Sequence, residues 1–316
     1  MEQVSFTGFM NEVIEELRRE GRYSTAHIYK YALYAVTGFV GGGEIFFGAL
    51  TRHWLKRFEC HIEGLQRSYN TISTYVRVLR AVYNRAVDRE LIRGEFRLFA
   101  GMKTGVYTER KLAVTAGQMK QLLKTDHRTE FPAAVSKSQD FLALMLLLQG
   151  MPFVDLAHLR KCDLNGDLLV CHRRKTGTEL CVKVVPEAMR LIERYRNTDP
   201  SSPYLLDILD AGQEGESAFY GYCERLRELN RNLSLLPALC GMKGLKVSSY
   251  TARHTWATLA KYCQVPEEII SEGLGHSSLE VTRTYLKSFE GNELAKANRI
   301  IIDYIYLGRK NLWRMA

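Results

Sequence analysis

Hydrophobic residues recur at spacings of three and four through most of the first hundred positions, which predicts amphipathic helices. The pattern fills four stretches, at residues 6–20, 24–40, 50–65 and 70–91. In the last stretch the apolar stripe consists of Ile72, Val76, Leu79 and Tyr83. Helices of this kind bury their stripes against one another, so the sequence predicts a small helical bundle at the N-terminal end.

A stretch without clear periodicity separates this bundle from the rest of the chain. Residues 100–115 contain two glycines and no regular pattern. We therefore expect a domain at 1–103, a linker at 104–114 and a second domain at 115–316. Thr115 followed by Gln118 has the spacing of a capping box, which predicts a helix start at the beginning of the second domain.

The second domain adds a short β-structure to its helices. An apolar run at 141–148 predicts a buried helix, whereas residues 167–175 and 179–186 alternate with a period of two. The turn residues between these alternating stretches predict a β-hairpin with Lys175 at its tip. Helical patterns then resume to the C-terminus, so the expected fold class is mainly α with a small β-sheet.

The chain is basic, with 44 Lys and Arg against 35 Asp and Glu and a formal net charge of +9. This balance favours a polyanionic partner, nucleic acid first and an anionic membrane surface second. On the helix predicted at 70–91, Arg77, Arg80 and Arg85 lie off the apolar stripe. We expect these arginines to contact DNA phosphates, although a solvated helix face has the same pattern.

Cysteine usage and hydropathy argue against several classes of protein. The seven cysteines are scattered and form no C-x-x-C pair, so the sequence signals neither a disulfide framework nor a zinc site. Every apolar run is far too short to span a bilayer, and the first twenty residues do not have the pattern of a targeting segment. We therefore expect a soluble, cytoplasmic protein.

Candidate chemistry appears first around residue 250. Ser248 or Ser249 can cap a helix that starts at this point. The first turns of this helix carry Tyr250, Arg253 and His254. Because helix N–H groups and a guanidinium both match phosphate oxygens, Arg253 is a candidate phosphate ligand, with a structural salt bridge as the alternative. His254 is expected to be a core histidine.

A second candidate cluster surrounds a predicted break between two helices. One helix can end at Gly275 or at the glycine two residues earlier, just before His276. Ser277 and Glu280 have capping-box spacing and predict the start of the next helix, which carries Tyr285. The sequence therefore sets a histidine and a tyrosine on either side of a helix start.

Tyr285 can act as a nucleophile only if neighbouring groups activate its hydroxyl. A tyrosine with an unperturbed pKa near 10 is a poor nucleophile unless positive charge and a proton acceptor lie close by. Arg253, His276 and Lys175 can supply these groups. Each of the four residues also has an ordinary structural explanation, so spacing alone predicts only a basic, mostly helical protein that binds DNA.

Three sequence blocks stand in order along the second domain: RRKTG at 173–177, YTARHTWATLA at 250–260 and LGHSSLEVTRTYL at 274–286. With the helical N-terminal region, they resemble the tyrosine recombinase (phage integrase) family over nearly the whole chain. The resemblance implies a helical core-binding (SAM-like) domain and a mixed α/β catalytic domain that form a C-shaped clamp around double-stranded DNA. It also implies inverted-repeat core sites, a protein that is monomeric when free and homotetrameric on DNA, and no cofactor.

The resemblance assigns roles to individual residues. Tyr285 matches the nucleophile, which attacks a DNA phosphate to give a 3′-phosphotyrosyl link and a free 5′-hydroxyl. Arg253 matches the second catalytic arginine, and His276 matches a histidine that donates to the same phosphate. Lys175 matches the hairpin lysine that protonates the departing 5′-oxygen. Tyr250 stands where the family usually has another histidine, and its hydroxyl can donate a hydrogen bond.

One catalytic position departs from the family pattern. In QGMPFVD, Pro152 stands where the family usually has its first catalytic arginine, and Asp155 occupies the acidic position that follows. A proline carries no donor that could replace a guanidinium. The nearest cations in sequence are Arg160, Arg173 and Arg174, and we expect Arg173 and Arg174 to bind DNA.

Three functions are compatible with the resemblance and with its departure at Pro152. The first is a site-specific recombinase, a DNA strand transferase that performs integration, excision or inversion. The second is a degenerate relative that binds DNA without cutting it, a hypothesis motivated by Pro152. The third is an enzyme similar to type IB topoisomerases, which relaxes DNA through the same chemistry. The apolar segment at 292–313 is expected to pack on its own domain or to dock on a neighbouring protomer.

Overall fold

The computed structural model describes residues 4–107, 112–124, 131–276, 278 and 281–282. The chain divides into two compact units, Met1–Glu109 with Gly215–Phe219 and Arg110–Glu214 with Tyr220–Ala316. Three expected features lie outside the described residues: Tyr285, the capping box of Ser277 and Glu280, and the apolar segment at 292–313.

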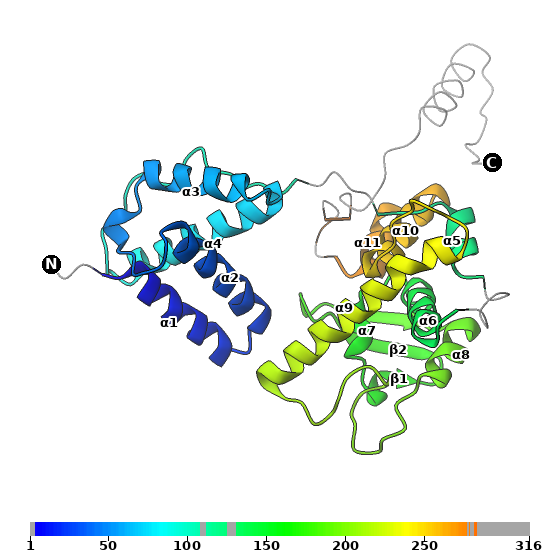
Figure 1. The fold of residues 1–316 in the computed structure, drawn as a ribbon. Helices are drawn as coiled ribbons and strands as arrows, with labels where there is room; N and C mark the ends of the chain where they lie inside the picture. Colours follow the sequence, from blue (N-terminus) through cyan, green and yellow to red (C-terminus); the bar gives the residue numbers. More distant parts are fainter. Residues whose placement is uncertain (1–3, 108–111, 125–130, 277, 279–280, 283–316) are drawn as a thin grey trace, which may run out of the picture. The chain divides into compact units, whose positions relative to one another are not determined.

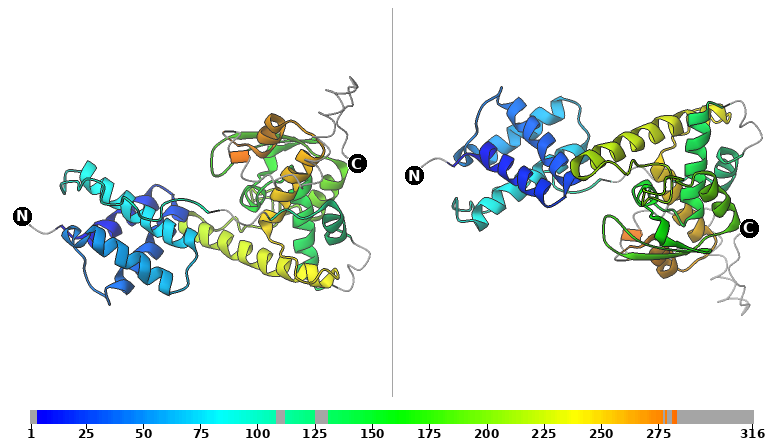
Figure 2. Two further views of the ribbon diagram at one scale, coloured as in Figure 1. Left: turned by 90° about the horizontal axis from the view of Figure 1, so that it is seen from above. Right: turned by 90° about the horizontal axis from the view of Figure 1, so that it is seen from below.

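The N-terminal unit is helical (Figures 1 and 2). Its described helices are α1 (Phe6–Arg19), α2 (Tyr23–Phe39), α3 (Arg52–Gly64) and α4 (Tyr69–Asp88), with a single 3₁₀ turn at η1 (Phe47–Ala49). The apolar stripe expected on α4 is buried against the other helices, since its four residues are at most 7 % exposed. Ser68 starts α4 by accepting a hydrogen bond from the backbone N–H of Thr71.

The second unit combines helices with a small sheet. In chain order its elements are α5 (Ala116–Leu122), α6 (Ala133–Leu147), α7 (Phe153–Ala157), η3 (Lys161–Asp163), β1 (Leu164–Asn165), β2 (Leu168–His172), β3 (Glu179–Lys183), α8 (Pro186–Arg194), α9 (Gly215–Leu239, from Tyr220 onward), α10 (Ser249–Tyr262) and α11 (Glu267–Leu274). The capping box expected at the start of α5 is present, because Thr115 and Gln118 exchange hydrogen bonds. The expected fold class, mainly α with a small sheet, is confirmed.

The sheet is antiparallel with strand order β1-β2-β3. The β2–β3 hairpin predicted from the period of two is present, and Val170 pairs with Cys181 in its register. Its inner face is apolar: Leu169, Cys171, Leu180 and Val182 join the core that α6, α8 and α9 also line. The hairpin is thus anchored by one face, while its loop, residues 173–178, extends from the packed strands.

No helix in the described part of the chain is both long enough and apolar enough to cross a membrane. The apolar run at 141–148 instead forms most of the second half of α6, where Leu142, Leu144 and Met145 are fully buried in the core.

Candidate active site

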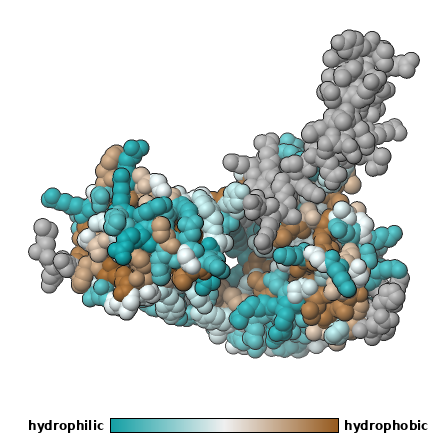
Figure 3. Space-filling view, turned by 45° about the horizontal axis from the view of Figure 1, so that its top comes forward, coloured by the Kyte–Doolittle hydropathy of each residue, from teal (hydrophilic) through white to brown (hydrophobic). Residues whose placement is uncertain are grey.

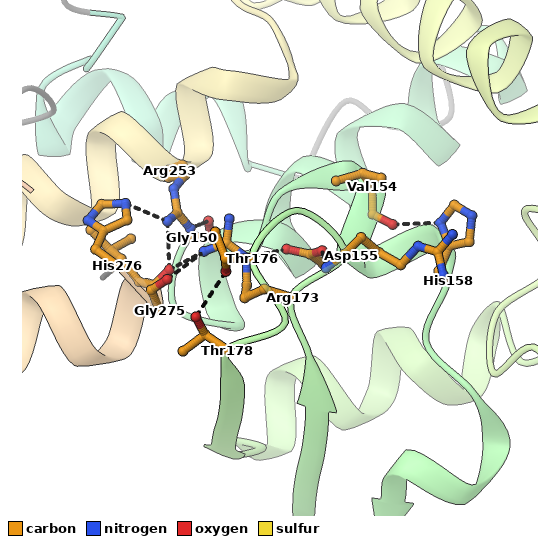
Figure 4. A network of polar contacts seen from close by, with 12 residues as sticks. Gly150, Val154, Asp155, His158, Arg173, Thr176, Thr178, Arg253, Gly275 and His276 are labelled. Carbon is orange, nitrogen blue, oxygen red and sulfur yellow. Dashed lines mark hydrogen bonds and ion pairs between the residues drawn. The ribbon is translucent and has the colours of Figure 1, made fainter. Parts of the chain in front are cut away.

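Arg253 lies in the second turn of α10 and is only 2 % exposed. Its guanidinium is held by backbone carbonyl groups from two other segments (Figure 4). Nη1 donates to the carbonyl oxygen of Gly150 at 3.1 Å, and Nη2 donates to that of Leu274 at 2.6 Å. Carbonyl oxygens carry only partial charge, so these contacts orient the guanidinium without neutralising it.

Gly150 allows the chain to approach α10 closely. Its φ of +70° lies in the left-handed region, and a Cβ at this position would lie 3.0 Å from the Cα of Arg253. Glycine meets both demands because it has no Cβ and adopts positive φ readily. The glycine of QGMPFVD therefore places the carbonyl group that binds Arg253 Nη1.

His276 contacts Arg253 from the segment that follows α11. Its Nε2 lies 2.8 Å from Arg253 Nη2, and its Nδ1 lies 2.8 Å from the hydroxyl of Thr282. A guanidinium can only donate, so Nε2 accepts, and the ring proton resides on Nδ1 and is donated to Thr282. Burial, followed by the charges of Arg253 and Arg173, lowers the pKa of His276 to about 4. The imidazole is therefore neutral at pH 7.

Arg173 lies directly after β2 and is 8 % exposed. Its Nε donates to Oδ2 of Asp155 at 2.5 Å, while the other carboxylate oxygen accepts from the backbone N–H of Arg174 at 2.8 Å. Its Nη1 donates to the carbonyl oxygen of Leu274, the same oxygen that accepts from Arg253. Two guanidinium groups thus meet at one backbone oxygen.

Gly275 brings these groups together. It ends α11 in a left-handed conformation, with φ of +62°. A Cβ on Gly275 would lie 2.8 Å from the side chain of Leu180 and 3.2 Å from Cγ of Arg173. The helix end therefore packs directly on the hairpin, and the next residue, His276, is directed to Arg253.

Pro152 and Tyr250 lie beside Arg253. Pro152 precedes α7 as its N-cap residue, and it lines one small pocket with Tyr250, Arg253 and Tyr222. Tyr250 is 54 % exposed, and burial raises the pKa of Tyr222, which therefore keeps its proton at neutral pH. His254 is buried, as expected for a core histidine.

The remaining basic residues expected at the site are exposed. Lys175 and Arg174 lie in the loop between β2 and β3, and Arg160 precedes η3. Of the three arginines named as the nearest cations to Pro152, Arg173 alone is buried and shares a ligand with Arg253. The position of Tyr285 falls outside the described residues.

In the N-terminal unit, the arginines expected to bind DNA differ in their surroundings. Arg77 and Arg80 are exposed on α4. Arg85 is half-buried and lies 3.4 Å from the carboxylate of Glu16, which also pairs with Arg89 at 2.7 Å. Hydrophilic side chains cover much of the face of this unit seen in Figure 3.

Within the described residues there is no group of three or more His, Cys, Asp or Glu side chains that could hold a metal ion. The cysteines of this part of the chain are all free thiols.

Some contributors to the site were not identified from the sequence. Thr282 fixes the tautomer of His276, and the carbonyl groups of Gly150 and Leu274 orient Arg253. Backbone acceptors leave no residue-type signal, which explains why they were missed. The ion pair of Arg173 with Asp155 joins two residues that the sequence singled out separately.

Comparison with known proteins identifies both parts of the chain. Residues 5–97 match the phage integrase SAM-like domain, and residues 113–291 match the phage integrase family. The chain belongs to the phage integrase family. Phage integrases of this family are tyrosine recombinases, so the protein is a site-specific DNA recombinase that acts as a DNA strand transferase.

This phage integrase family member is similar to two archaeal recombinases. Tyrosine recombinase XerA of Pyrococcus horikoshii is 25 % identical over 268 residues, which cover 74 % of this chain and 88 % of the relative. Tyrosine recombinase XerA of Thermococcus kodakarensis is 28 % identical over 289 residues, which cover 88 % of this chain and 91 % of the relative.

Solved structures show the fold of this phage integrase family member. A lambda integrase (75–356) dimer bound to a COC′ core site has a TM-score of 0.66 at 12 % identity, over 91 % of this chain and 100 % of that chain. The Tn1549 transposon integrase (82–397) in complex with circular intermediate DNA has a TM-score of 0.60 at 14 % identity, over 94 % of this chain and 99 % of that chain. A lambda integrase tetramer bound to a Holliday junction has a TM-score of 0.62 at 13 % identity, over 90 % and 78 %.

Proposed function

We propose that this recombinase cuts DNA with the hydroxyl group of Tyr285 and forms a 3′-phosphotyrosyl intermediate. The observation that supports this best is the contact of Arg253 Nη2 with His276 Nε2 at 2.8 Å. These residues come from different elements, and each matches a family position that binds the scissile phosphate. Donors held in place before the substrate arrives are what phosphoryl transfer requires.

Cleavage exchanges one phosphoester bond for another. The oxygen of Tyr285 forms a bond to phosphorus while the bond from phosphorus to the 5′-oxygen breaks. The tyrosine proton passes to His276 Nε2, which carries a lone pair when Nδ1 holds the ring proton. Lys175 gives a proton to the departing 5′-oxygen, which leaves as a hydroxyl. Rejoining to a 5′-hydroxyl of another strand reverses these transfers, so no external energy source is needed.

Charge at the phosphate falls to Arg253 and to His276 once it is protonated. Once His276 has accepted the tyrosine proton, the phosphate anion stabilises the imidazolium, which then donates from Nε2. Arg253 contributes charge-assisted hydrogen bonds to the nonbridging oxygens. Tyr250 adds a neutral donor from the exposed start of α10.

A covalent-trapping assay tests the role of Tyr285. Duplexes with a randomised core are first selected by binding to the protein, then rebuilt with a nick that makes cleavage irreversible. Wild type is expected to form an SDS-resistant adduct that Tyr285→Phe abolishes. Tyr220→Phe, which removes a phenol from α9, serves as the matched control and should cut normally. Binding without an adduct in wild type contradicts the proposal and supports a DNA-binding relative that does not cut.

The DNA partner and the assembly follow from the same proposal. The structures of lambda integrase as a dimer on a core site and as a tetramer on a Holliday junction support two copies on an inverted repeat and four in a synapse. We expect a free monomer, with Arg77, Arg80 and Arg174 contacting DNA. Native mass spectrometry with and without the selected duplex measures these states, and a stable free tetramer would contradict them.

The proposed domain division is 1–103, 104–114 and 115–316. It is supported by the two family matches, at 5–97 and 113–291. Limited proteolysis tests it, since we expect the first cuts between residues 104 and 114. A relaxing enzyme of the topoisomerase type is not favoured, because the similar proteins are recombinases; it would relax supercoils without paired sites.

A further inference from the structure

We infer that Arg173 supplies the second guanidinium of the phosphate site, in place of the arginine that is absent at Pro152. The inference rests on the proposed function, since it concerns the same scissile phosphate. Loss of a single oxyanion donor commonly slows an enzyme by about a hundredfold to a thousandfold. A recombinase with proline at this position therefore needs a cation from another part of its fold.

Arg173 and Arg253 bind the same backbone oxygen. Its Nη1 and the Nη2 of Arg253 both donate to the carbonyl oxygen of Leu274. The two nitrogens therefore lie within two hydrogen-bond lengths of each other, roughly 6 Å at most. His276 lies on Arg253 and is also influenced by the charge of Arg173, which helps to lower its pKa. Arg173, Arg253 and His276 therefore form one connected cluster.

The two guanidinium groups share a single neighbouring carboxylate among the described contacts. Two buried guanidinium groups repel each other, and burial strengthens this repulsion. Asp155 is the carboxylate that pairs with Arg173, and it accepts from Nε rather than from either terminal nitrogen of the guanidinium. Among the residues that the structure describes, Nη2 of Arg173 makes no hydrogen bond. A phosphate that bridges the two guanidinium groups would relieve the repulsion and satisfy this nitrogen.

Asp155 and Gly275 hold Arg173 in place at the end of β2. Asp155 accepts from both the side chain of Arg173 and the backbone of Arg174, which fixes the guanidinium and its strand together. Gly275 removes the Cβ that would collide with Arg173 Cγ. Arg160 and Arg174, by contrast, are exposed and have no comparable support in the described contacts. Arg173, like Arg253, is thus buried and held by hydrogen bonds to other segments.

A purely structural role would also explain these contacts, because Arg173 holds the turn that carries His276. Chemistry on the substrate separates the two roles. A methylphosphonate at the scissile position replaces one nonbridging oxygen by a methyl group and removes the negative charge. A guanidinium that acts on this charge becomes dispensable on the neutral substrate, whereas one that only holds the protein together does not.

The experiment compares wild type and Arg173→Met on selected duplexes with phosphodiester or methylphosphonate at the cleavage position. On the phosphodiester we expect Arg173→Met to form the covalent adduct about a hundredfold to a thousandfold more slowly, with duplex binding little changed. On the methylphosphonate we expect the two proteins to differ by less than about tenfold. An equal deficit on both substrates, or no deficit on either, overturns the inference.

Three further variants control for misfolding, for the loss of a positive charge and for rescue of the activity. Asp155→Asn combined with Arg173→Met removes both buried charges, so it folds even where the single variant does not, and it should show the same recovery on methylphosphonate. Lys183→Met removes an equal charge from an exposed position on β3 and should cut at nearly the wild-type rate. Pro152→Arg in the Arg173→Met background should restore at least part of the lost rate. Failure of wild type to form any adduct rejects the proposed function itself.

Discussion

Each unit of the molecule contains an arginine–carboxylate cluster, and the two clusters differ mainly in burial. In the catalytic unit, Arg173 pairs with Asp155 at 2.5 Å, and the two side chains are 9 % and 2 % exposed. In the N-terminal unit, Glu16 pairs with Arg89 at 2.7 Å and Arg85 at 3.4 Å, and all three side chains are at least 25 % exposed. Glu16 has two arginine partners where Asp155 has one, yet water screens each of them. Burial, rather than the number of partners, should decide what each cluster contributes.

Asp155→Ala should have the largest effect, because it leaves the guanidinium of Arg173 buried without its carboxylate. We expect the free energy of unfolding to fall by about 3–5 kcal/mol. Urea denaturation of the whole protein measures the loss. Asp167→Ala is the matched control, since it removes an exposed partner of Lys183 from the turn between β1 and β2. Equal losses for the two variants would remove the distinction between buried and exposed pairs.

Gly150→Ala should follow, because the new Cβ meets the backbone of Arg253 and the residue has positive φ. We expect a loss of about 1–3 kcal/mol in stability, together with slower DNA cleavage as Arg253 shifts. Gly166→Ala controls for backbone strain alone, because its φ is +60° and no atom lies near its Cβ position. If both variants are equally stable and equally active, the close approach to α10 has no consequence.

The charge state of His276 should give a smaller, pH-dependent effect. Unfolded histidine has a pKa near 6.5, while burial and two arginines lower the folded value to about 4. Between these values the unfolded state binds a proton that the folded state does not, so stability falls as pH decreases from 6.5 to 4. Melting temperatures of His276→Gln should fall less over this range. His172→Gln, at an exposed histidine of β2, should behave like wild type, and identical slopes for all three proteins would contradict the assignment.

Glu16→Gln should have the smallest effect. The hydrogen bond from Arg89 lowers the pKa of Glu16, yet the carboxylate is close to water. We expect a loss of less than about 1 kcal/mol that disappears at high salt, measured by urea denaturation at two ionic strengths. A loss as large as that of Asp155→Ala would mean that exposure does not separate the two clusters.

Local periodicity accounts for the parts of the fold that the sequence predicted. The stripe on α4 and the alternation of β2 and β3 each specify one buried face, so the four N-terminal helices and the hairpin could be expected. The resemblance also pointed to Arg253 and His276, which the structure brings together. Roles for Tyr285 and Lys175 stay predictions.

The meeting of Arg173 with Arg253 could not be read from the sequence. It depends on the end of β2, the turn at Gly150, the second turn of α10 and the end of α11, which lie far apart in the chain. Their common acceptor is the carbonyl group of Leu274, and every residue carries such a group. Tertiary packing selects this one, and no local pattern of residue types reports that choice.

The β2–β3 loop separates the two proposed roles along its length. Arg173 is held at the base of the loop by Asp155 and by the carbonyl group of Leu274, whereas Lys175 lies exposed two residues further along. A displacement of the loop tip would therefore withdraw the proposed leaving-group acid and leave the inferred phosphate ligand in place. Strand cleavage would then stop while the phosphate stays bound.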